Sequence, residues 1–325
     1  METDSGQDIP ERGGRGQAGH VPVLLKEAID FLAIRRGGTY LDATVGLGGH
    51  SLEIAKRLGA PGHLIGFDKD PVALEVASRL LRVAGKRSDD EQLPSSDQRL
   101  ATGDWPTVTL IHGAFSEVGE RVAPSSSDGI LADLGVSSLQ LGDAARGFSF
   151  QAEGPLDMRM NPMSGETAEQ VVNRISEREL ADVIYEFGEE RRSRRIARAI
   201  VRSRPIWTTK QLADVVSAAA WPMNQAERRI HPATRTFQAL RIFVNRELDD
   251  LKALLETAPG VLKPGGRLVV ISFHSLEDRI VKDALRAGSG KYFRLLTKKP
   301  VTASEEEIAG NPRSRSAKLR AAERL

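Results

Sequence analysis

Glycines and acids in the first quarter of the sequence are spaced as in a nucleotide-type cofactor site. Gly46, Gly48 and Gly49 directly follow a β-rich run at 39–45, and Asp68 ends the next such run. Glycines there let the backbone approach a ligand without Cβ clashes. A carboxylate after the second strand can accept hydrogen bonds from both ribose hydroxyls. We therefore expect a nucleoside-containing cofactor across the carboxyl edge of a sheet.

Two details indicate which cofactor this is. The dinucleotide fingerprint G-x-G-x-x-G fails at its last position, which is Ser51. Asp42 stands close to the glycines, where a carboxylate would repel a pyrophosphate but suit a cationic sulfonium or α-amino group. The pattern favours S-adenosylmethionine over NAD. A glycine-rich turn without a ligand, and Asp68 as a simple helix-start residue, remain open.

A further acid is placed for amine chemistry. Asp133 lies near the end of the strand candidate at 128–135, at the sheet edge where open α/β folds bind ligands. The lone pair of an aromatic exocyclic amine is delocalised into the ring, so the amine is a poor nucleophile. An acceptor at its N–H groups stabilises the charge that develops during methyl transfer. Asp133 can provide that acceptor, while the cofactor provides the methyl group.

A second polar turn follows the strand candidate at 267–273. His274 could orient the target base or pass on the departing proton. The alternative is an ordinary strand-to-helix turn, in which Ser275 caps the helix and Asp278 completes a capping box. The other histidines show no metal-ligand spacing, and no metal site is expected.

The elements that position these residues alternate between strand and helix at first. That alternation predicts a parallel, doubly wound α/β sheet. Residues 143–245 contain no convincing strand and are predicted to be helical, before a β pattern returns at 267–273. The last segments, YFRLLTKKPV and SAKLRAAERL, could supply two edge strands, although the final one also fits a helix. We expect a disordered tail at 1–19 and a surface loop at 85–106. The two halves of one domain are expected at 20–142 and 246–325, with a helical insert at 143–245 between them.

Composition excludes several classes of protein. The chain has 325 residues, with Lys+Arg at 46, Asp+Glu at 44 and a net charge of +2. It contains no cysteine, which excludes disulfides, thiolate metal sites and cysteine nucleophiles and fits a cytoplasmic protein. No apolar run approaches the length of a membrane span.

Positive charge is concentrated in three segments. The segment 189–204 carries seven arginines around a helical apolar pattern, and we select Arg191, Arg194 and Arg198 from it as RNA contacts. Arg235 belongs to the second segment, and the third lies near the C-terminus. A solvated helix face paired to local glutamates is the alternative.

Many stretches resemble the bacterial small-subunit (16S) ribosomal RNA cytosine-N4 methyltransferase family, also called the MraW family. The resemblance covers nearly everything from His20 to the C-terminus. The stretches are HVPVLLKEAID, DATVGLGGHS, GFDKDP, HGAF, DLGVSSLQL, RGFSF, GPLDMRM, YEFGEERRSRRIARAI, HPATRTFQALRIFVN, LKPGGRLVVISFHSLEDRIVK and NPRSRSAKLRAAE.

The resemblance implies a class I, Rossmann-like methyltransferase domain interrupted by an all-helical substrate-recognition domain. It implies S-adenosylmethionine as cofactor and N4 of a decoding-region cytidine as target, in small-subunit ribosomal RNA and in the small ribosomal subunit. The implied cofactor contacts match positions in these motifs. They are Gly48, Gly49, His50, Asp68, Phe115, Asp133 and Gln140, to which the glycine turn itself adds Asp42 and Gly46.

Some features depart from better-known patterns. The Pro-Pro-aromatic signature of DNA amino-methylases is absent after Asp133, and the polar pair Ser137-Ser138 could help to hold the base instead. The segments 1–19 and 85–106 look extra and could affect partners or a homodimer contact. The alternatives are a non-catalytic, cofactor-binding ribosome-assembly protein, an NAD-dependent oxidoreductase and a DNA amino-methyltransferase.

Overall fold

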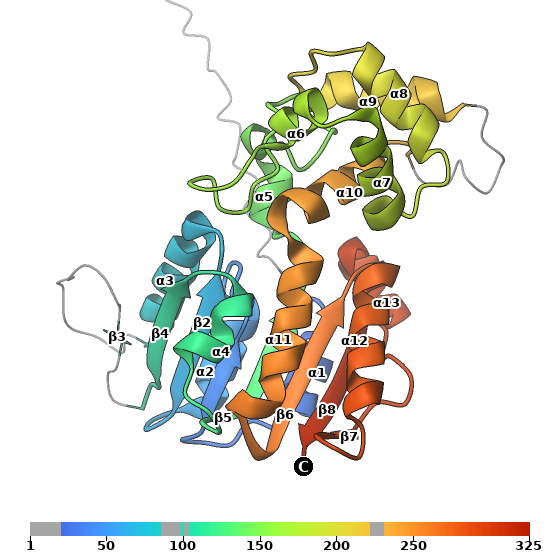
Figure 1. Cartoon of the computed structure of the whole chain (residues 1–325). Coiled ribbons are helices and arrows are strands. Elements are labelled where there is room, and N and C mark those ends of the chain that lie inside the picture. Colours follow the sequence, from blue (N-terminus) through green and yellow to red (C-terminus); the bar gives the residue numbers. More distant parts are fainter. Residues whose placement is uncertain (1–20, 86–98, 101–103, 222–230) are drawn as a thin grey trace, which may run out of the picture.

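A twisted sheet with helices on both faces forms one half of the molecule (Figure 1). The computed structural model describes residues 21–85, 99–100, 104–221 and 231–325. The expected tail at 1–19, and most of the expected loop at 85–106, lie outside these residues. No helix within the described ranges is both long and apolar enough to cross a membrane.

The sheet has eight strands in the order β3-β4-β2-β1-β5-β6-β8-β7. Strands β4, β2, β1, β5 and β6 are parallel, whereas β3, β8 and β7 run antiparallel to their neighbours. The bounds in chain order are Thr39–Asp42, His63–Asp68, Arg99–Leu100, Thr107–His112, Ser127–Asp133, Leu262–Ser272, Phe293–Leu295 and Lys318–Arg324. The predicted α/β class and its parallel centre are confirmed.

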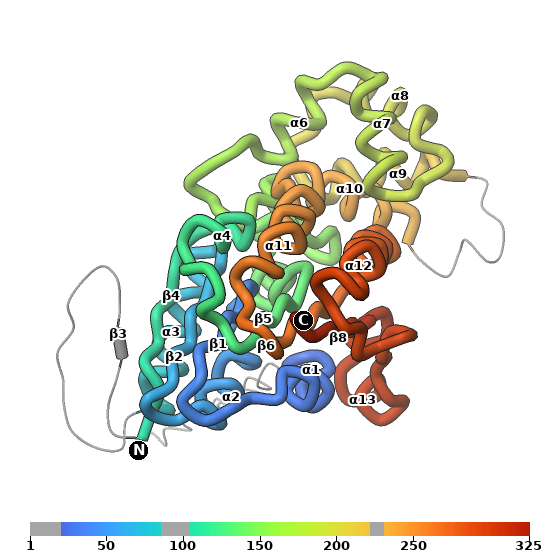
Figure 2. Tube along the Cα trace, turned by 60° about the horizontal axis from the view of Figure 1, so that its bottom comes forward, coloured from blue at the N-terminus to red at the C-terminus, as the bar shows by residue number. Residues whose placement is uncertain are grey.

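Apolar residues of the central strands bury both faces of the sheet, as parallel strands require. Ile130 and Ala132 of β5 pack with helices α11 (Glu247–Val261) and α12 (Ser275–Gly288). Leu131, between them, packs on the opposite face with α1 (Leu25–Leu32) and α2 (Gly49–Leu58). This alternation follows from the two-residue period of a strand. Figure 2 shows the sheet between the two helix pairs. The remaining helices of this half are α3 (Pro71–Gly85), α4 (Val118–Arg121) and α13 (Glu305–Gly310).

The C-terminal segment occupies a different position in the sheet from the expected one. The strand alternative is correct for SAKLRAAERL, but β8 is not an edge strand, because it lies between β6 and β7. Arg320 of β8 is buried and forms an ion pair with Asp278 of α12, with Nε 2.7 Å from Oδ1. The expected loop at 85–106 likewise contains the short strand β3.

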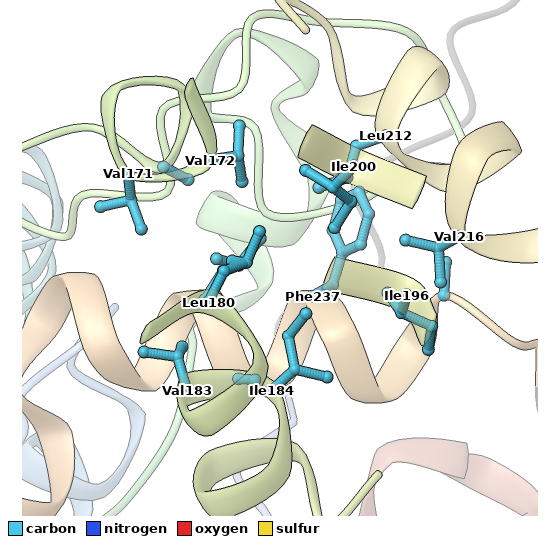
Figure 3. Close-up of a cluster of buried hydrophobic side chains, with 14 of the residues drawn as sticks. Val171, Val172, Leu180, Val183, Ile184, Ile196, Ile200, Leu212, Val216 and Phe237 are labelled. Atoms are coloured by element: carbon cyan, nitrogen blue, oxygen red, sulfur yellow. The ribbon is translucent and has the colours of Figure 1, made fainter. Parts of the chain in front are cut away.

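Helices occupy the chain between β5 and α11, and they share a core of their own. Four of them begin at capping boxes, at Ser137, Thr167, Ser176 and Thr208. Figure 3 shows their apolar side chains meeting in this core. The helices are α5 (Ser138–Gly142), α6 (Ala168–Arg174), α7 (Glu177–Gly188), α8 (Ser193–Arg202), α9 (Thr209–Ala220) and α10 (Thr234–Asn245). The expected domain boundaries stay a prediction.

The side-chain amide of Asn245 ties the end of α10 to the segment before α6. Asn245, the last residue of α10, donates through Nδ2 to the carbonyls of Met158 and Arg241, at 2.7 and 2.8 Å. Its Oδ1 accepts from the backbone N–H of Met160 at 2.7 Å. Arg246 then turns the chain into α11 with a left-handed φ of 53°. The side-chain bonds tie the end of α10 to the segment at 158–160, and the carbonyl of Asn245 accepts from Nζ of Lys69, which follows β2, at 2.6 Å.

Candidate functional site

A cavity of about 690 Å³ opens at the carboxyl edge of the sheet. This volume is typical of small-molecule sites. Its walls come from the turns after β1, β2 and β5, from α11 and from the segment before β8. The predicted residues that line it are Gly46, Gly49, His50, Asp68, Phe115, Asp133, Ser137 and Gln140.

The glycine turn after β1 is shaped by backbone geometry. Gly46 has a φ of +52° and its N–H donates to Asp68 Oδ2 at 2.7 Å. A Cβ on Gly49, the first residue of α2, would lie 2.4 Å from Cγ of Pro22. Both glycines line the cavity, so the turn offers a close backbone approach to a ligand.

Gly48 has a packing role in the turn, and its expected cofactor contact stays a prediction. It does not line the cavity. Its N–H donates to Val45 O at 2.8 Å, and its φ is +84°. A Cβ there would lie 3.1 Å from Cβ of Ala77, so glycine at this position lets α2 approach α3. The structure thus uses Gly48 for packing and turn geometry.

Asp42 lies behind the cavity wall, and its expected cofactor contact stays a prediction. Its side chain is fully buried and absent from the cavity wall. Oδ2 accepts from the hydroxyl of Ser51 at 2.5 Å, and Oδ1 accepts from the N–H of Thr44 at 3.1 Å. Burial raises the pKa of Asp42 to about 6, although these hydrogen bonds oppose the rise. Asp42 therefore braces the start of α2 from behind the turn.

Asp68 keeps its expected place at the end of β2. Its two oxygens accept from the backbone N–H groups of Gly46 and Asp70, at 2.7 and 2.8 Å. Burial raises the pKa of Asp68 to about 6 against these hydrogen bonds. A carboxylate oxygen can accept more than one hydrogen bond. Asp68 therefore retains acceptor capacity toward the cavity.

Asp133 combines two properties that no other described acid of the cavity shares. Its Oδ1 atom is buried and has no hydrogen-bond partner among the described residues. Burial, followed by the negative charge of Asp42, raises the pKa of Asp133 well above its ordinary value, while the charge of Arg313 opposes this. A buried acceptor without a donor costs free energy, so a ligand N–H group would be stabilised here.

His50 fixes the other oxygen of Asp133. Its Nδ1 lies 3.4 Å from Asp133 Oδ2, and its Nε2 lies 3.1 Å from Val23 O. A carbonyl oxygen only accepts, so Nε2 carries a hydrogen and Nδ1 faces the carboxylate. A proton between Nδ1 of His50 and Oδ2 of Asp133 is therefore shared by these two side chains.

Ser137 and Gln140 shape the turn after β5. Ser137 caps α5: its Oγ accepts from the N–H of Gln140 at 3.2 Å, and Gln140 Oε1 accepts from the N–H of Ser137 at 3.0 Å. Gln140 Nε2 also donates to buried Asp70 at 2.9 Å. Phe115 begins a short 3-10 helix and packs at the edge of a sheet-face core. These residues give the cavity a rigid wall.

His274 is placed next to the cavity but does not line it. It caps α12, and its Nε2 lies 3.1 Å from Oε1 of buried Glu277, which does line the cavity. Burial would raise the pKa of Glu277, but His274 and Arg241 outweigh burial and lower it.

The predicted cap of α12 is therefore wrong by one residue. The capping box joins His274 and Glu277, whereas Ser275 contacts Glu189 and Asp278 pairs with Arg320.

Sequence reasoning missed four charged residues of the cavity. Lys69 forms an ion pair with Asp250 and donates to Asn245 O at 2.6 Å. Glu247 accepts both arms of the Arg241 guanidinium at 2.8 Å. The fourth is Arg313, which lies in a basic segment that we associated only with RNA. No local pattern marks these residues. Among the residues the structure describes, no cluster of acids and histidines is arranged to hold a metal ion.

The predicted RNA contacts lie on the helical part and do not line the cavity. Arg191, Arg194 and Arg198 are exposed at α8 and its N-terminal turn, and Figure 1 shows α8 remote from the sheet. Arg198 Nε lies 3.2 Å from Glu177, and Arg235 Nη1 lies 3.5 Å from Glu190. The pairing to local glutamates therefore holds for these two, and the RNA role stays a prediction.

Comparisons with known proteins cover nearly the whole chain. The profile of the MraW methylase family matches residues 17–325. "Ribosomal RNA small subunit methyltransferase H" of Koribacter versatilis is 70% identical over 325 residues, covering 99% of this chain and 99% of that protein. Proteins of the same name are 61% identical in Acidobacterium capsulatum, covering 94% of this chain and 98% of that protein, and 46% identical in Xanthomonas oryzae, covering 95% and 89%.

Proposed function

The chain belongs to the MraW methylase family, and we propose that it methylates the N4 amine of a cytidine in the decoding region of small-subunit ribosomal RNA. The names of its relatives support ribosomal RNA of the small subunit as the substrate. The observation that carries the amine assignment is the buried, unpartnered Oδ1 of Asp133 in the cavity wall.

The described residues fit S-adenosylmethionine as the cofactor. The positive-φ turn at Gly46 and the small Gly49 allow close backbone approach, and Asp68 has acceptor capacity for ribose hydroxyls. Phe115 and Gln140 complete the set that would hold the cofactor. When bound, S-adenosylmethionine supplies a methyl group on a positively charged sulfur, which the acidic wall of the cavity suits.

Asp133 then acts on the target amine. Its Oδ1 accepts a hydrogen bond from the N4 amine, which orients the amine and stabilises the positive charge that develops on nitrogen. The amine would take the methyl group as the bond between the methyl carbon and the sulfonium sulfur breaks, leaving a neutral thioether, and it would lose one proton to give neutral N4-methylcytidine. A carboxylate with a raised pKa is a better proton acceptor than an ordinary one, so Asp133 takes that proton. His50 holds the carboxylate in place through Oδ2.

RNA reaches the cavity under the helical part. A stacked or paired cytosine must be turned out of the RNA to enter, at a cost of a few kcal/mol. Arg191, Arg194 and Arg198 are exposed, and they bind phosphates of the RNA at a distance from the cavity. We place the substrate within the small ribosomal subunit and the reaction in the cytoplasm.

The test is methyl transfer from labelled S-adenosylmethionine to isolated small subunits, with the product nucleoside identified by mass spectrometry. We expect N4-methylcytidine from the native protein and a loss of at least about 100-fold in Asp133→Ala. Asp143→Asn is the matched control, because Asp143 is exposed and lies outside the cavity wall. Cofactor binding without any transfer by the native protein would favour a non-catalytic assembly protein.

A further inference from the structure

The charges of the cavity are almost all paired within the protein. Glu247, Asp250 and Glu277 have Arg241, Lys69 and His274 as ion-pair partners. Asp68 accepts two backbone N–H groups. In the described part of the chain, one cavity cation, Arg313, has no ion pair. Two buried cavity carboxylate oxygens lack a hydrogen bond, Asp133 Oδ1 and Asp250 Oδ2, and only Asp250 Oδ2 has an ion-pair partner, Lys69.

Arg313 is held close to the loop that carries Asp133. It lies in a 3-10 helix at Pro312–Ser316 and is half-buried. Its Nη2 donates to Val136 O at 2.5 Å, and Val136 follows Asp133 in the loop after β5. Arg313 and Asp133 line the same cavity, and the charge of Asp133 raises the pKa of Arg313 while burial lowers it. The other guanidinium N–H groups have no partner among the described residues, so the guanidinium is fixed but not saturated.

We propose that Arg313 donates hydrogen bonds to N3 and O2 of the target cytosine while Asp133 accepts from its N4 amine. This inference rests on the proposed function and adds the residue that recognises the base. The Watson–Crick edge of cytosine presents a donor at N4 next to acceptors at N3 and O2. A carboxylate oxygen beside a planar guanidinium is the complementary arrangement.

The same pair rejects uracil. Uracil presents an acceptor at O4 and a donor at N3, so the carboxylate would face an acceptor and the guanidinium would face a donor. Both mismatched contacts would leave buried polar groups unpaired, which discriminates strongly between bases. Asp133 and Arg313 therefore act as one recognition unit, although only Asp133 also serves the methyl transfer.

The first experiment compares Arg313→Met, Arg313→Lys and Arg286→Met. Arg286 is the matched control, since it is exposed on α12 and lies outside the cavity wall and outside the three basic segments. Lysine retains the charge and one donor for Val136 O, so it keeps the contact that helps the segment to fold. Both Arg313 variants should lose about 10- to 100-fold in kcat/KM on isolated small subunits, whereas the control stays within about threefold. Affinity for S-adenosylhomocysteine, measured by calorimetry, should stay within about twofold in all three.

Each contrary outcome has a distinct meaning. A parallel fall in S-adenosylhomocysteine affinity would assign Arg313 to the cofactor carboxylate and overturn base recognition. Unchanged kcat/KM in folded Arg313→Lys and Arg313→Met would also overturn it. Failure of the native protein to form N4-methylcytidine would instead remove the proposed function on which the inference rests.

A modified substrate separates a base contact from a phosphate contact. Small subunits are rebuilt with 3-deazacytidine at the target, which replaces the N3 acceptor by C–H. The native protein should lose about 10-fold or more in kcat/KM on this substrate, and Arg313→Met should lose no more than it loses on cytidine, since the contact is already gone. Losses that multiply would show that Arg313 contacts another group, such as a phosphate, and would overturn the proposal.

Discussion

Replacing Asp42 by asparagine should stabilise the protein at neutral pH and leave cofactor binding nearly unchanged. The carboxylate is fully buried between Ser51 and Thr44, away from the cavity wall. Asparagine has the same shape. Its Oδ1 can accept from the N–H of Thr44, and its Nδ2 can donate to Ser51 once that hydroxyl rotates. The substitution therefore removes a buried charge without removing a hydrogen bond.

The size of the effect follows from the pKa of Asp42, which burial raises from 3.8 to about 6. Each pKa unit corresponds to about 1.4 kcal/mol, so the charged carboxylate costs the folded state about 3 kcal/mol. The folded protein binds more protons than the unfolded chain between pH 3.8 and about 6. The free energy of unfolding of the native protein therefore falls as pH rises through this window. The asparagine variant lacks this fall, because its side chain does not titrate. Its advantage should be about 1 kcal/mol at pH 4.5 and about 3 kcal/mol at pH 7.5.

Urea unfolding of both proteins at pH 4.5 and 7.5 measures this difference. Asp143→Asn is the control, because Asp143 is an exposed cap whose role asparagine can take. A variant less stable than the native protein at pH 7.5, or a gain independent of pH, would refute the buried-charge argument. Loss of S-adenosylhomocysteine binding in Asp42→Asn would restore the hypothesis that Asp42 contacts the cofactor. Because the charge of Asp42 also raises the pKa of Asp133, the acid limb of the activity profile should move to lower pH.

Three further variants test the packing and the RNA surface. Gly48→Ala should lower the free energy of unfolding by about 1–2 kcal/mol, because its φ is +84° and a Cβ would press on α3; urea unfolding measures the loss, and unchanged S-adenosylhomocysteine affinity confirms a packing role. Asn245→Ala should cost about 1–3 kcal/mol in the same assay, since three backbone groups lose a hydrogen bond and the one to Met158 O is buried. Replacing Arg191, Arg194 and Arg198 together by glutamine should weaken binding to small subunits and flatten its salt dependence, with cofactor affinity unchanged. Equal affinity for the subunits would place the RNA surface elsewhere.

The sequence predicted the parallel sheet because each central strand is a short apolar run bounded by turn residues. It also located the glycine turn, whose spacing is local. It did not separate Asp42 from Asp133, although both end strands near the turn. The carboxylate of Asp42 lies beneath α2 and accepts a hydrogen bond from Ser51, whereas the carboxylate of Asp133 faces the cavity. That difference depends on which helix covers the strand end, and no spacing along the chain contains this information.

The cap of α12 illustrates a different limit. His274 and Ser275 are adjacent, and each is followed three residues later by an acid, so two capping boxes fit the sequence equally well. The structure selects His274 with Glu277, since Glu277 is buried beside Arg241 from α10, and it leaves Asp278 to Arg320 from β8. Partners from distant elements therefore decide between two local patterns that are otherwise equivalent.

The direction of β8 explains how Arg313 reaches a site whose other residues come from the first half of the chain and from α11 and α12. Strand β8 pairs antiparallel with β6, and its first residue, Lys318, lies opposite Ser272 at the carboxyl end of β6. The residues just before an antiparallel strand stand at the edge where the parallel strands end, so the segment that carries Arg313 arrives beside Asp133. Had the last segment formed a helix, as its sequence also allows, nothing in the chain would fix Arg313 there. The placement of the one unpaired cavity cation among the described residues thus depends on an interior strand whose small residues, Ala321 and Ala322, let both faces of the sheet close over it.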